Sequence, residues 1–574
     1  MTLSDPAEAG KETTAAAGQG GPARAAMRKN RTRWLPALAL LPALLLTLWL
    51  PLNGDVAYVL GGLETAGRGG VSVWDVFVAR PIAYRLFLAG LDGFRGLLPG
   101  ADSFAARNAI VRLEADLVII LVGIVLYLGL RRFCRPAVAA VSALATTAAL
   151  LISPPWHYLQ PDWVAVVAGV LAVGAACAPR RWWLGALLGG FATFLTIAVK
   201  LATAPIAVIA LLLIAALCVR RALWTAAAAI AFTGIWYVLT KQFLPWEWTW
   251  FNDQAALVHN SPIHHAPNLT DFRRFRMAAY DVMIVSPIVV LAPAAVVVLA
   301  RRRLRYYALA AVIAGLSVSS AYAQGEWFMY HFAVVPVLAA GVWGAAFGAN
   351  RRARLPLGIG LLAASLASAV LLRQPVDWRL TQLGLVSKAY LLGAVLIAGW
   401  AGLAARGART DQPSRWTAVA GTAAATLAML PACLPASAYA FSGYNANAWN
   451  VLGVDNSAFD DLSKRLGRDT PVLYLAFGSV AYKMGNPTAC RYPSPQWLQR
   501  STYLPQVRDY PSYSDNLRCL TDDKTARYVV ISSSWFRVTG ADAEVQGLIA
   551  ARFDCSDQAR VPAPGDLVVC PARS

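Results

Sequence analysis

Long apolar runs recur along this chain from Trp34 to about residue 434, with only short polar segments between them. Runs of 17 to 25 apolar residues have the length of a helix that crosses a bilayer. Hydrophobic residues make up 57% of the chain and charged residues only 14%, a balance that a soluble domain does not carry. The sequence therefore predicts a mostly α-helical, polytopic membrane protein.

We expect about thirteen membrane spans. Their ranges are 34–52, 112–130, 136–154, 163–178, 183–199, 204–219, 222–244, 279–300, 306–323, 330–348, 355–372, 389–405 and 416–434. Because the number is odd, the two termini are expected on opposite sides of the membrane.

Six clusters of arginine fall on one face of the membrane if thirteen spans are assumed, together with the basic arm that precedes the first span. These clusters are 131–135, 180–181, 220–221, 301–305, 351–354 and 406–409. By the positive-inside rule this face is cytoplasmic. The clustering also accounts for the net charge of +20 as a topological signal, so nucleic acid is not an expected partner.

The chain divides into three parts by composition. Residues 1–33 are rich in Ala, Gly and Thr and predict a disordered cytosolic arm. Residues 34–434 form the membrane domain, whose largest outer loop is 53–111. The polar tail, 435–574, alternates short apolar runs with helical stretches, which predicts a small extracytoplasmic α/β domain. Its expected strands and helices are 472–477, 528–531, 567–569, 457–466 and 541–552.

Four of the eight cysteines lie in this tail, on a face expected to be oxidising, and they indicate two disulfides. Three pairings are possible. We favour Cys490–Cys519 and Cys555–Cys570 because each closes a local loop. A zinc site is the competing interpretation, but the tail has no histidine and the cysteine spacings are wide, so we expect no metal there.

Asp55 follows the first span and begins a loop rich in arginine, including Arg80 and Arg85. A carboxylate at the membrane surface near a group of cations suits an enzyme that acts on a lipid-borne anion. The alternative is an interfacial segment whose arginines only meet lipid headgroups. We favour a functional role for Arg80 and Arg85.

Four further candidates lie at the outer ends of later spans. Asp162 precedes one span, where an N-cap is an equally good explanation. Lys200 closes another, and its alternative role is snorkelling to the interface. Tyr330 and His331 open a late span, and a histidine at the edge of hydrocarbon is costly unless it faces a cavity or a partner.

A third large loop, 245–278, contains His259, His264 and His265 near two acidic residues. Their spacing matches no standard ligand set, so structural or acceptor-contact roles are favoured over a metal site.

These motifs together resemble the GT-C superfamily of integral-membrane glycosyltransferases. The resemblance rests on Gly54, Asp55 and Tyr58, on Arg80-Pro81 with Tyr84, on Gln160-Pro161-Asp162, on Lys200 and on Tyr330-His331. The layout looks most like the aminoarabinose, protein O-mannosyl and oligosaccharyl transferase branches.

Two positions depart from the family pattern. Asp55 is followed by Val56 and not by a second acidic residue, which argues against a metal-dependent pyrophosphate donor. Glu326 stands where relatives often carry a lysine. We therefore expect neither a cofactor nor a metal.

The resemblance implies an inverting glycosyltransferase that moves a sugar from a polyprenyl-phosphate donor to an envelope glycan, lipid or protein. Asp55 would act as general base on the acceptor hydroxyl. Cations would stabilise the departing phosphate. The implied donor phosphate ligands are Arg80, Arg85, Lys200 and His331, and the implied substrate-binding residues are Tyr58, Tyr84, Asp162 and Tyr330.

Two other functional classes are weighed against this one. A lipid-linked-sugar flippase would carry charges inside its spans, whereas the charges here gather at one face. A non-enzymatic assembly protein would bind envelope polysaccharide through its tail. In each case the expected location is the inner or plasma membrane, among membrane lipids, with a cytoplasmic N-terminus and an extracytoplasmic C-terminus.

Overall fold

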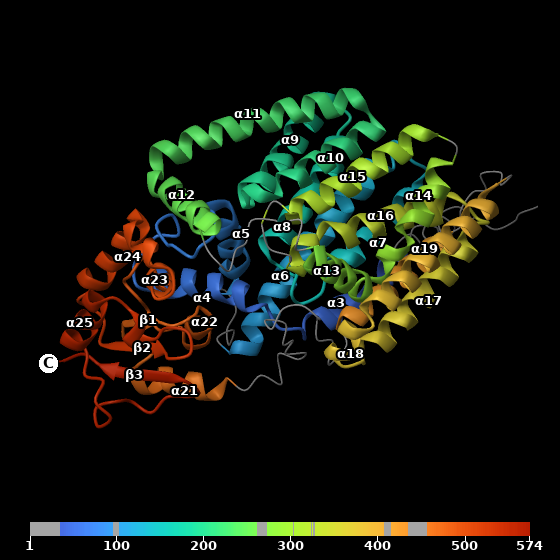
Figure 1. The fold of residues 1–574 in the computed structure, drawn as a ribbon. Helices are drawn as coiled ribbons and strands as arrows, with labels where there is room; N and C mark the ends of the chain where they lie inside the picture. Colours follow the sequence, from blue (N-terminus) through green and yellow to red (C-terminus); the bar gives the residue numbers. More distant parts are fainter. Residues whose placement is uncertain are drawn as a thin grey trace, which may run out of the picture.

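The structure, a computed structural model, describes residues 35–95, 103–260, 272–301, 303–322, 324, 328–406, 415–433 and 456–573. It consists of a bundle of long helices with a small domain at one end (Figure 1). The predicted arm 1–33, the start of the tail, and His264, His265 and Glu326 lie outside the described residues.

The bundle and its connecting segments are almost wholly helical. The elements are α2 (Leu35–Leu38), α3 (Leu41–Thr47), α4 (Gly54–Arg68), α5 (Ile82–Gly93), α6 (Phe104–Leu130), α7 (Pro136–Leu151), α8 (Pro161–Cys177), α9 (Trp182–Val199), η2 (Leu201–Thr203), α10 (Ala204–Leu217), α11 (Val219–Phe243), α12 (Pro245–Asn260), α13 (Phe272–Val285), η4 (Pro287–Leu291), α14 (Ala292–Ala300), α15 (Leu304–Tyr322), η5 (Met329–Phe332), α16 (Val334–Ala349), α17 (Arg354–Leu372), α18 (Val376–Thr381), α19 (Leu383–Ala405), α20 (Arg415–Met429) and η6 (Leu430–Cys433).

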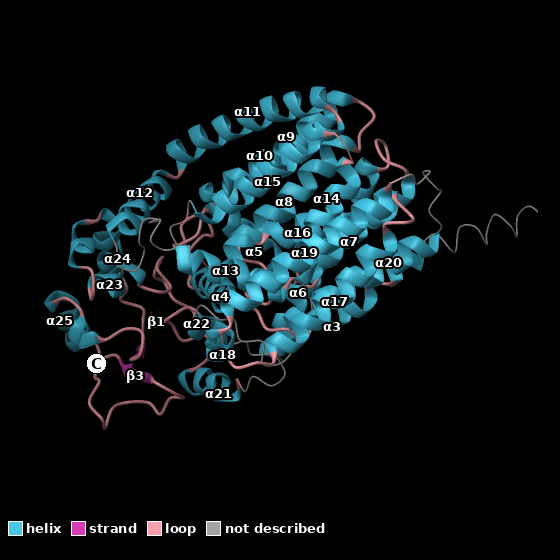
Figure 2. Ribbon diagram, turned by 45° about the vertical axis from the view of Figure 1, so that its right-hand side comes forward, coloured by secondary structure: helices cyan, strands magenta, loops and turns pink. Residues whose placement is uncertain are grey.

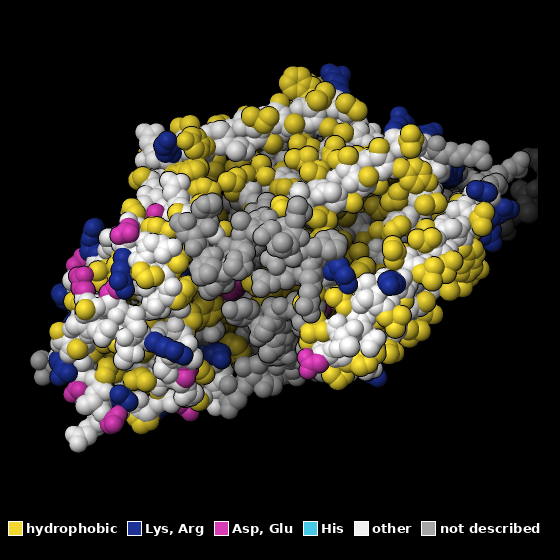
Figure 3. All heavy atoms as spheres, in the orientation of Figure 1, with side chains coloured by type: hydrophobic (Ala, Val, Ile, Leu, Met, Phe, Trp, Pro, Cys, Tyr) yellow, Lys and Arg dark blue, Asp and Glu magenta, His cyan; other side chains and the backbone are white. Residues whose placement is uncertain are grey.

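Six helical segments in the described ranges are long and apolar enough to cross a membrane, or seven if one bent pair counts as a span. The six are Trp182–Val199, Val219–Phe243, Leu304–Tyr322, Met329–Ala349, Arg354–Leu372 and Leu383–Ala405. Hydrophobic side chains dominate the visible face of the bundle, whereas the small domain carries mixed charges (Figure 3). The chain is a multi-pass membrane protein, and the number thirteen stays a prediction.

Two predicted spans are interrupted, and proline accompanies each break. The run 34–52 forms two short helices, α2 and α3, and Pro42 sits in the first turn of α3. The run 279–300 bends by 96° between Phe275–Val285 and Pro287–Ala300. Proline lacks the backbone N–H that continues a helix, so an apolar run containing it need not be one straight span.

The centre of the bundle is α8, which packs against α6, α9 and α10, while α7 packs against α16 and α20 (Figure 2). Nearly every residue of α8 is buried, including Asp162 at its start. Small residues on these helices allow their backbones to come close, as is usual between helices in lipid.

The tail folds around a three-stranded sheet in the order β1 (Val472–Leu475), β2 (Tyr528–Ser532), β3 (Leu567–Pro571). Strands β1 and β2 are parallel, with Leu473 opposite Val529, and β3 runs antiparallel to β2. The flanking helices are α21 (Ser457–Leu466), α22 (Ser479–Met484), α23 (Gln496–Ser501), η8 (Pro505–Asp509), α24 (Pro511–Asp522), η9 (Val538–Gly540) and α25 (Ala543–Arg552). The three predicted strands and two predicted helices of the tail are confirmed.

The tail packs tightly on α4 of the first loop. The ring of Tyr58 on α4 stacks on Phe477 at a centroid distance of 5.4 Å. A Cβ atom at Gly478 would overlap Tyr58, and one at Gly61 would overlap the backbone of Tyr482, so glycine is required at both places. The interface is therefore a permanent part of the fold.

A second connection to the tail runs through α12. Helix α11 packs along α9 at the edge of the bundle, and α12 continues from its end to the tail, where it lies against α24 (Figures 1 and 2). Asp253 accepts a hydrogen bond from the backbone N–H of Ser512 at 2.9 Å, and Gln254 accepts one from Arg500 at 2.8 Å. The tail is thus fixed to two separate loops of the membrane domain.

Both predicted disulfides are present, Cys490–Cys519 and Cys555–Cys570. The first anchors the segment that follows α22 to α24. This segment donates Thr488 N–H to the carbonyl of Thr65, and its Arg491 carbonyl accepts from Phe77 N–H. Cys490–Cys519 therefore holds the part of the tail that contacts the first loop.

We expect the double substitution Cys490→Ser and Cys519→Ser to destabilise the tail by about 3 to 4 kcal/mol, because it frees a long loop in the unfolded chain. Hydrogen exchange of the α4 backbone should rise in this variant. The matched variant with Cys555→Ser and Cys570→Ser should weaken the tail without loosening α4. Equal exchange at α4 in the two variants would contradict this assignment.

Candidate active site

Asp55 lies in the first turn of α4, at the end of the bundle that carries the tail. Asn53 caps this helix by accepting the backbone N–H of Asp55 at 2.7 Å. Oδ2 of Asp55 faces Nη2 of Arg80 and Nε2 of Gln160, each at 3.4 Å. The side chain of Asp55 is 30% exposed, so the carboxylate is accessible.

Arg80 is held against Asp55 by an unusual backbone. The preceding residue, Ala79, has φ of 51°, a left-handed conformation that non-glycine residues seldom adopt, and its carbonyl accepts from Arg80. Burial lowers the pKa of Arg80, but the charge of Asp55 and the nearby Tyr330 offset this, and the pKa is raised. The guanidinium therefore stays charged.

Two tyrosines complete this side of the site. Tyr84 donates a hydrogen bond to the carbonyl of Leu159 at 2.7 Å, which joins α5 to the turn before α8. Tyr58 is buried, and its hydroxyl has no hydrogen-bond partner in the described part of the chain. Burial raises the pKa of each tyrosine, while Arg80 acts in the opposite direction. Both hydroxyls stay neutral.

A second charged group surrounds Asp162 at the start of α8. Lys200 Nζ lies 2.9 Å from Oδ2 of Asp162, and Gln324 Nε2 donates to Oδ1 at 2.7 Å. Lys200 also donates to the side chain of Gln324. Asp162 is buried, whereas the Lys200 side chain is 27% exposed. An ammonium has three donors, so one remains for a ligand.

Tyr330 and His331 on η5 adjoin this group. Nζ of Lys200 lies 5.8 Å from the centre of the Tyr330 ring, which in turn contacts the His331 ring at 4.4 Å. His331 is buried and lies near both Asp162 and His157. Burial lowers the pKa of His157 to about 3, so this imidazole is neutral.

The two groups lie close together, because Gln160, which contacts Asp55, is separated from Asp162 only by Pro161, and Tyr84 donates to the carbonyl of the adjacent Leu159. Asp55, Tyr58, Arg80, Tyr84, Asp162, Lys200, Tyr330 and His331 thus come together from the first loop, the starts of α8 and η5, and the end of α9. Their carboxylates, cations and hydroxyls can support proton removal beside an anion.

Arg85 is the predicted residue that the structure places elsewhere. Its guanidinium is fully buried in an ion pair with Glu247 and lies over the ring of Trp246 at 5.0 Å. It also donates to the carbonyls of Arg80 and Trp74 at 3.2 Å. This arginine ties the first loop to α12, and we leave it out of the phosphate-binding set.

Gln160, Gln324, His157 and Arg500 are the site residues that sequence reasoning missed. Gln160 belongs to the Gln160-Pro161-Asp162 motif, but an uncharged amide does not by itself indicate a catalytic or phosphate-binding role. Arg500 belongs to the tail and lies near Tyr58, on which Phe477 of the tail stacks. Nothing in the local sequence around Arg500 indicates this contact.

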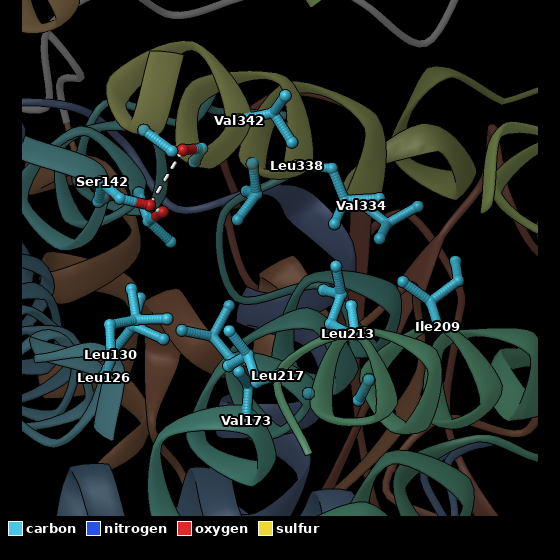
Figure 4. A pocket seen from close by; sticks show the side chains of 18 of the residues that line it. Leu126, Leu130, Ser142, Val173, Ile209, Leu213, Leu217, Val334, Leu338 and Val342 are labelled. Atoms are coloured by element: carbon cyan, nitrogen blue, oxygen red, sulfur yellow. Dashed lines mark hydrogen bonds between the residues drawn. The ribbon is translucent and has the colours of Figure 1, made fainter. Parts of the chain in front are cut away.

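An apolar cavity of about 290 Å³ lies inside the bundle. Val166 of α8, Ile206 of α10 and Val334 of α16 line one end of it, three to six residues along the chain from Asp162, Lys200 and His331, and Leu130 and Cys134 line the far end. Leucine and valine side chains from α10 and α16 face each other across it (Figure 4). A hydrocarbon chain fits this lining.

Among the described residues, no group of three His, Cys, Asp or Glu side chains is placed to hold a metal ion. The site as described consists of two carboxylates, two close cations, a histidine pair and three tyrosine hydroxyls.

Three comparisons relate the chain to known proteins. No family model matches it, and no curated protein does. Among solved structures it is similar to ArnT from Cupriavidus metallidurans in the apo state, at 14% identity and a TM-score of 0.49, over 95% of this chain and 98% of that one. The chain is also similar to ArnT from Cupriavidus metallidurans bound to undecaprenyl phosphate, at 14% identity and a TM-score of 0.48, over 94% of this chain and 98% of that one.

The archaeal oligosaccharyltransferase AglB from Archaeoglobus fulgidus, in complex with an inhibitory peptide and a dolichol-phosphate, is similar at 12% identity and a TM-score of 0.34, over 92% of this chain and 74% of that one.

Proposed function

We propose that this protein is an inverting glycosyltransferase that moves a sugar from a polyprenyl-phosphate donor to a hydroxyl of a cell-envelope acceptor. The observation that carries the proposal is the grouping of Asp55 with Arg80 and of Lys200 with Tyr330 and His331, a few residues along the chain from the lining of an apolar cavity. A carboxylate, a set of cations and a hydrocarbon-lined cavity are the three parts that such a donor and its acceptor require.

We propose a role for each group. Oδ2 of Asp55 is engaged by Arg80 and Gln160, which leaves Oδ1 for the acceptor proton. As the acceptor oxygen attacks the anomeric carbon, the bond to the phosphate oxygen breaks on the opposite face, and the configuration inverts. The polyprenyl phosphate leaves with increasing negative charge, which Arg80, Lys200 and His331 are placed to stabilise.

Other residues hold the sugar and the acceptor. Asp162 is fixed by Lys200 and Gln324 and is suited to orient donor hydroxyls. Tyr58, Tyr84 and Tyr330 line the same space and are proposed substrate contacts. We propose the tail and the loop 245–278 as the acceptor surface, and Phe477 of the tail stacks on Tyr58, three residues from Asp55. From the positive-inside pattern of the sequence, we propose that this end of the bundle lies outside the cytoplasm.

The experiment uses purified protein in proteoliposomes supplied with labelled polyprenyl-phosphate sugars and a mixture of envelope glycan, lipid and peptide acceptors. Transfer by the wild type, lost in Asp55→Asn, supports the proposal. Transfer that persists in Asp55→Asn at the wild-type rate would overturn the general base. Label that crosses the bilayer without transfer would identify a flippase instead.

The cavity gives a separate prediction about the donor's hydrocarbon chain. Cys134 lines its far end, while Cys218, which is also partly exposed, does not. We expect saturating polyprenyl phosphate to slow alkylation of Cys134 by N-ethylmaleimide severalfold and to leave Cys218 unchanged. Site-resolved mass spectrometry measures the extent of alkylation of both thiols in the same sample. Inorganic phosphate serves as the control, and equal rates at Cys134 with and without the lipid would contradict chain binding here.

A further inference from the structure

Gln160 contacts the proposed general base from a fully buried position. The residue is 0% exposed, and its Nε2 lies 3.4 Å from Oδ2 of Asp55. A carboxylate only accepts hydrogen bonds, so the amide must turn its NH₂ group toward Asp55. No group in the described part of the chain donates to Oδ1 of Asp55, so both contacts fall on the same oxygen.

An ordinary structural role does not explain this side chain. Gln160 occupies the N-cap position of α8, yet its side chain makes no capping hydrogen bond there. Its Oε1 is buried and has no partner within the described ranges. A buried carbonyl without a partner destabilises a fold. The amide is therefore kept at this place at a cost in stability.

Backbone strain points to the same carboxylate. Three non-glycine residues in the described chain have positive φ, and two of them are Ala79 and Leu159, at 51° and 62°. Each directly precedes one of the two donors to Oδ2, Arg80 and Gln160. Leu159 is fully buried, and its carbonyl is held by Tyr84. Strained residues persist where the surroundings fix them, and they gather at functional sites.

A neutral donor suits a general base better than a second cation. The charged and titratable groups that face Asp55 are Arg80, Tyr58 of α4 and Tyr84 of α5. A cation beside a carboxylate stabilises its charged form and weakens it as a base. An amide fixes the carboxylate with a smaller loss of basicity.

We propose that Gln160 is a positioning residue for the general base: its amide and Arg80 hold Oδ2 of Asp55, so that Oδ1 points to the acceptor hydroxyl. This inference rests on the proposed function. In this proposal, the strained turns at Ala79 and Leu159 orient Arg80 and Gln160 so that both donate to the same oxygen of Asp55.

The test compares Gln160→Met with the wild type in the proteoliposome assay, using whichever polyprenyl-phosphate sugar the wild type transfers. Methionine keeps the volume and removes both polar atoms. We expect kcat to fall about tenfold to a hundredfold, because the base loses its alignment. The acceptor KM should stay within about threefold, and the thermal unfolding midpoint should be equal to or higher than that of the wild type.

A second variant, Gln160→Glu, places a carboxylate beside Asp55. Two neighbouring carboxylates resist losing both protons, so the acid limb of the pH–rate profile should move to higher pH by about one unit. The matched control is Asn516→Leu in α24, another buried amide whose carbonyl has no partner in the described residues. It should leave both kcat and the pH profile unchanged.

The possible outcomes distinguish a failure of the proposed function from a failure of the role proposed for Gln160. Absence of transfer by the wild type, or full activity of Asp55→Asn, overturns the proposed function. Loss of transfer in Asp55→Asn with Gln160→Met within twofold of the wild-type kcat overturns only the role of Gln160. A Gln160→Met protein that loses stability and activity together, with an unshifted pH profile in Gln160→Glu, would show a purely structural role.

Discussion

Replacing Asp55 by Asn is expected to reduce kcat for sugar transfer about 100- to 10,000-fold, the usual contribution of a general base. The amide has nearly the same shape, so Arg80 and Gln160 keep a partner at this position, but it takes no proton from the acceptor. Donor binding should change less than threefold, because the phosphate is held by the cations. Steady-state transfer in proteoliposomes and equilibrium binding of polyprenyl phosphate measure the two quantities.

The control for this variant is Asp75→Asn, the same chemical change at an exposed carboxylate of the same loop. It should transfer sugar at the wild-type rate. A parallel loss in the two variants would point to the net charge of the loop and not to a base at Asp55.

Lys200→Met is expected to lower kcat/KM for the polyprenyl-phosphate sugar roughly 100-fold, or about 2.7 kcal/mol. The substitution removes a cation from the proposed phosphate site and leaves the buried carboxylate of Asp162 without its ion-pair partner. Such an unpaired buried charge also destabilises the fold. Both kcat/KM for transfer and the thermal unfolding midpoint should therefore decrease.

The double variant Lys200→Met with Asp162→Asn separates these effects. Removal of both charges should restore most of the stability while transfer stays low, because the phosphate contact is still absent. Lys241→Met removes a lysine at the end of α11, outside the site, and should leave transfer unchanged. A Lys200→Met protein as active as Lys241→Met would exclude Lys200 from donor binding.

Much of the site was predictable because its residues lie where apolar runs end. The carboxylates Asp55 and Asp162, and the cations Arg80 and Lys200, follow or precede recognisable hydrophobic segments, and a charge at such a border signals a membrane face. The tail strands and both disulfides were also predictable, since alternating apolar runs and local cysteine spacing are short-range signals. These elements are found as expected.

What failed depended on contacts between distant segments. Arg85 shares its loop with Arg80, but it pairs with Glu247, which is 162 positions away and on a different loop. Periodicity does not reveal which arginine of a loop will find a buried partner. The breaks at Pro42 and Pro287 were missed for a related reason, because mean hydropathy over a window does not register the lost backbone hydrogen bond. Gln160 is uncharged, so the sequence did not predict a role for it in the site, although it did for Asp162 of the same motif.

The close packing of the tail on α4 has a consequence for biogenesis. Arg68 of α4 contacts the carbonyl of Gly485, 417 positions further along the chain. The ring that stacks on Tyr58 belongs to Phe477, so the ribosome must first synthesise the chain as far as that residue. A product that stops before Phe477 would therefore lack the ring that stacks on Tyr58, and α4 would have no tail to pack against.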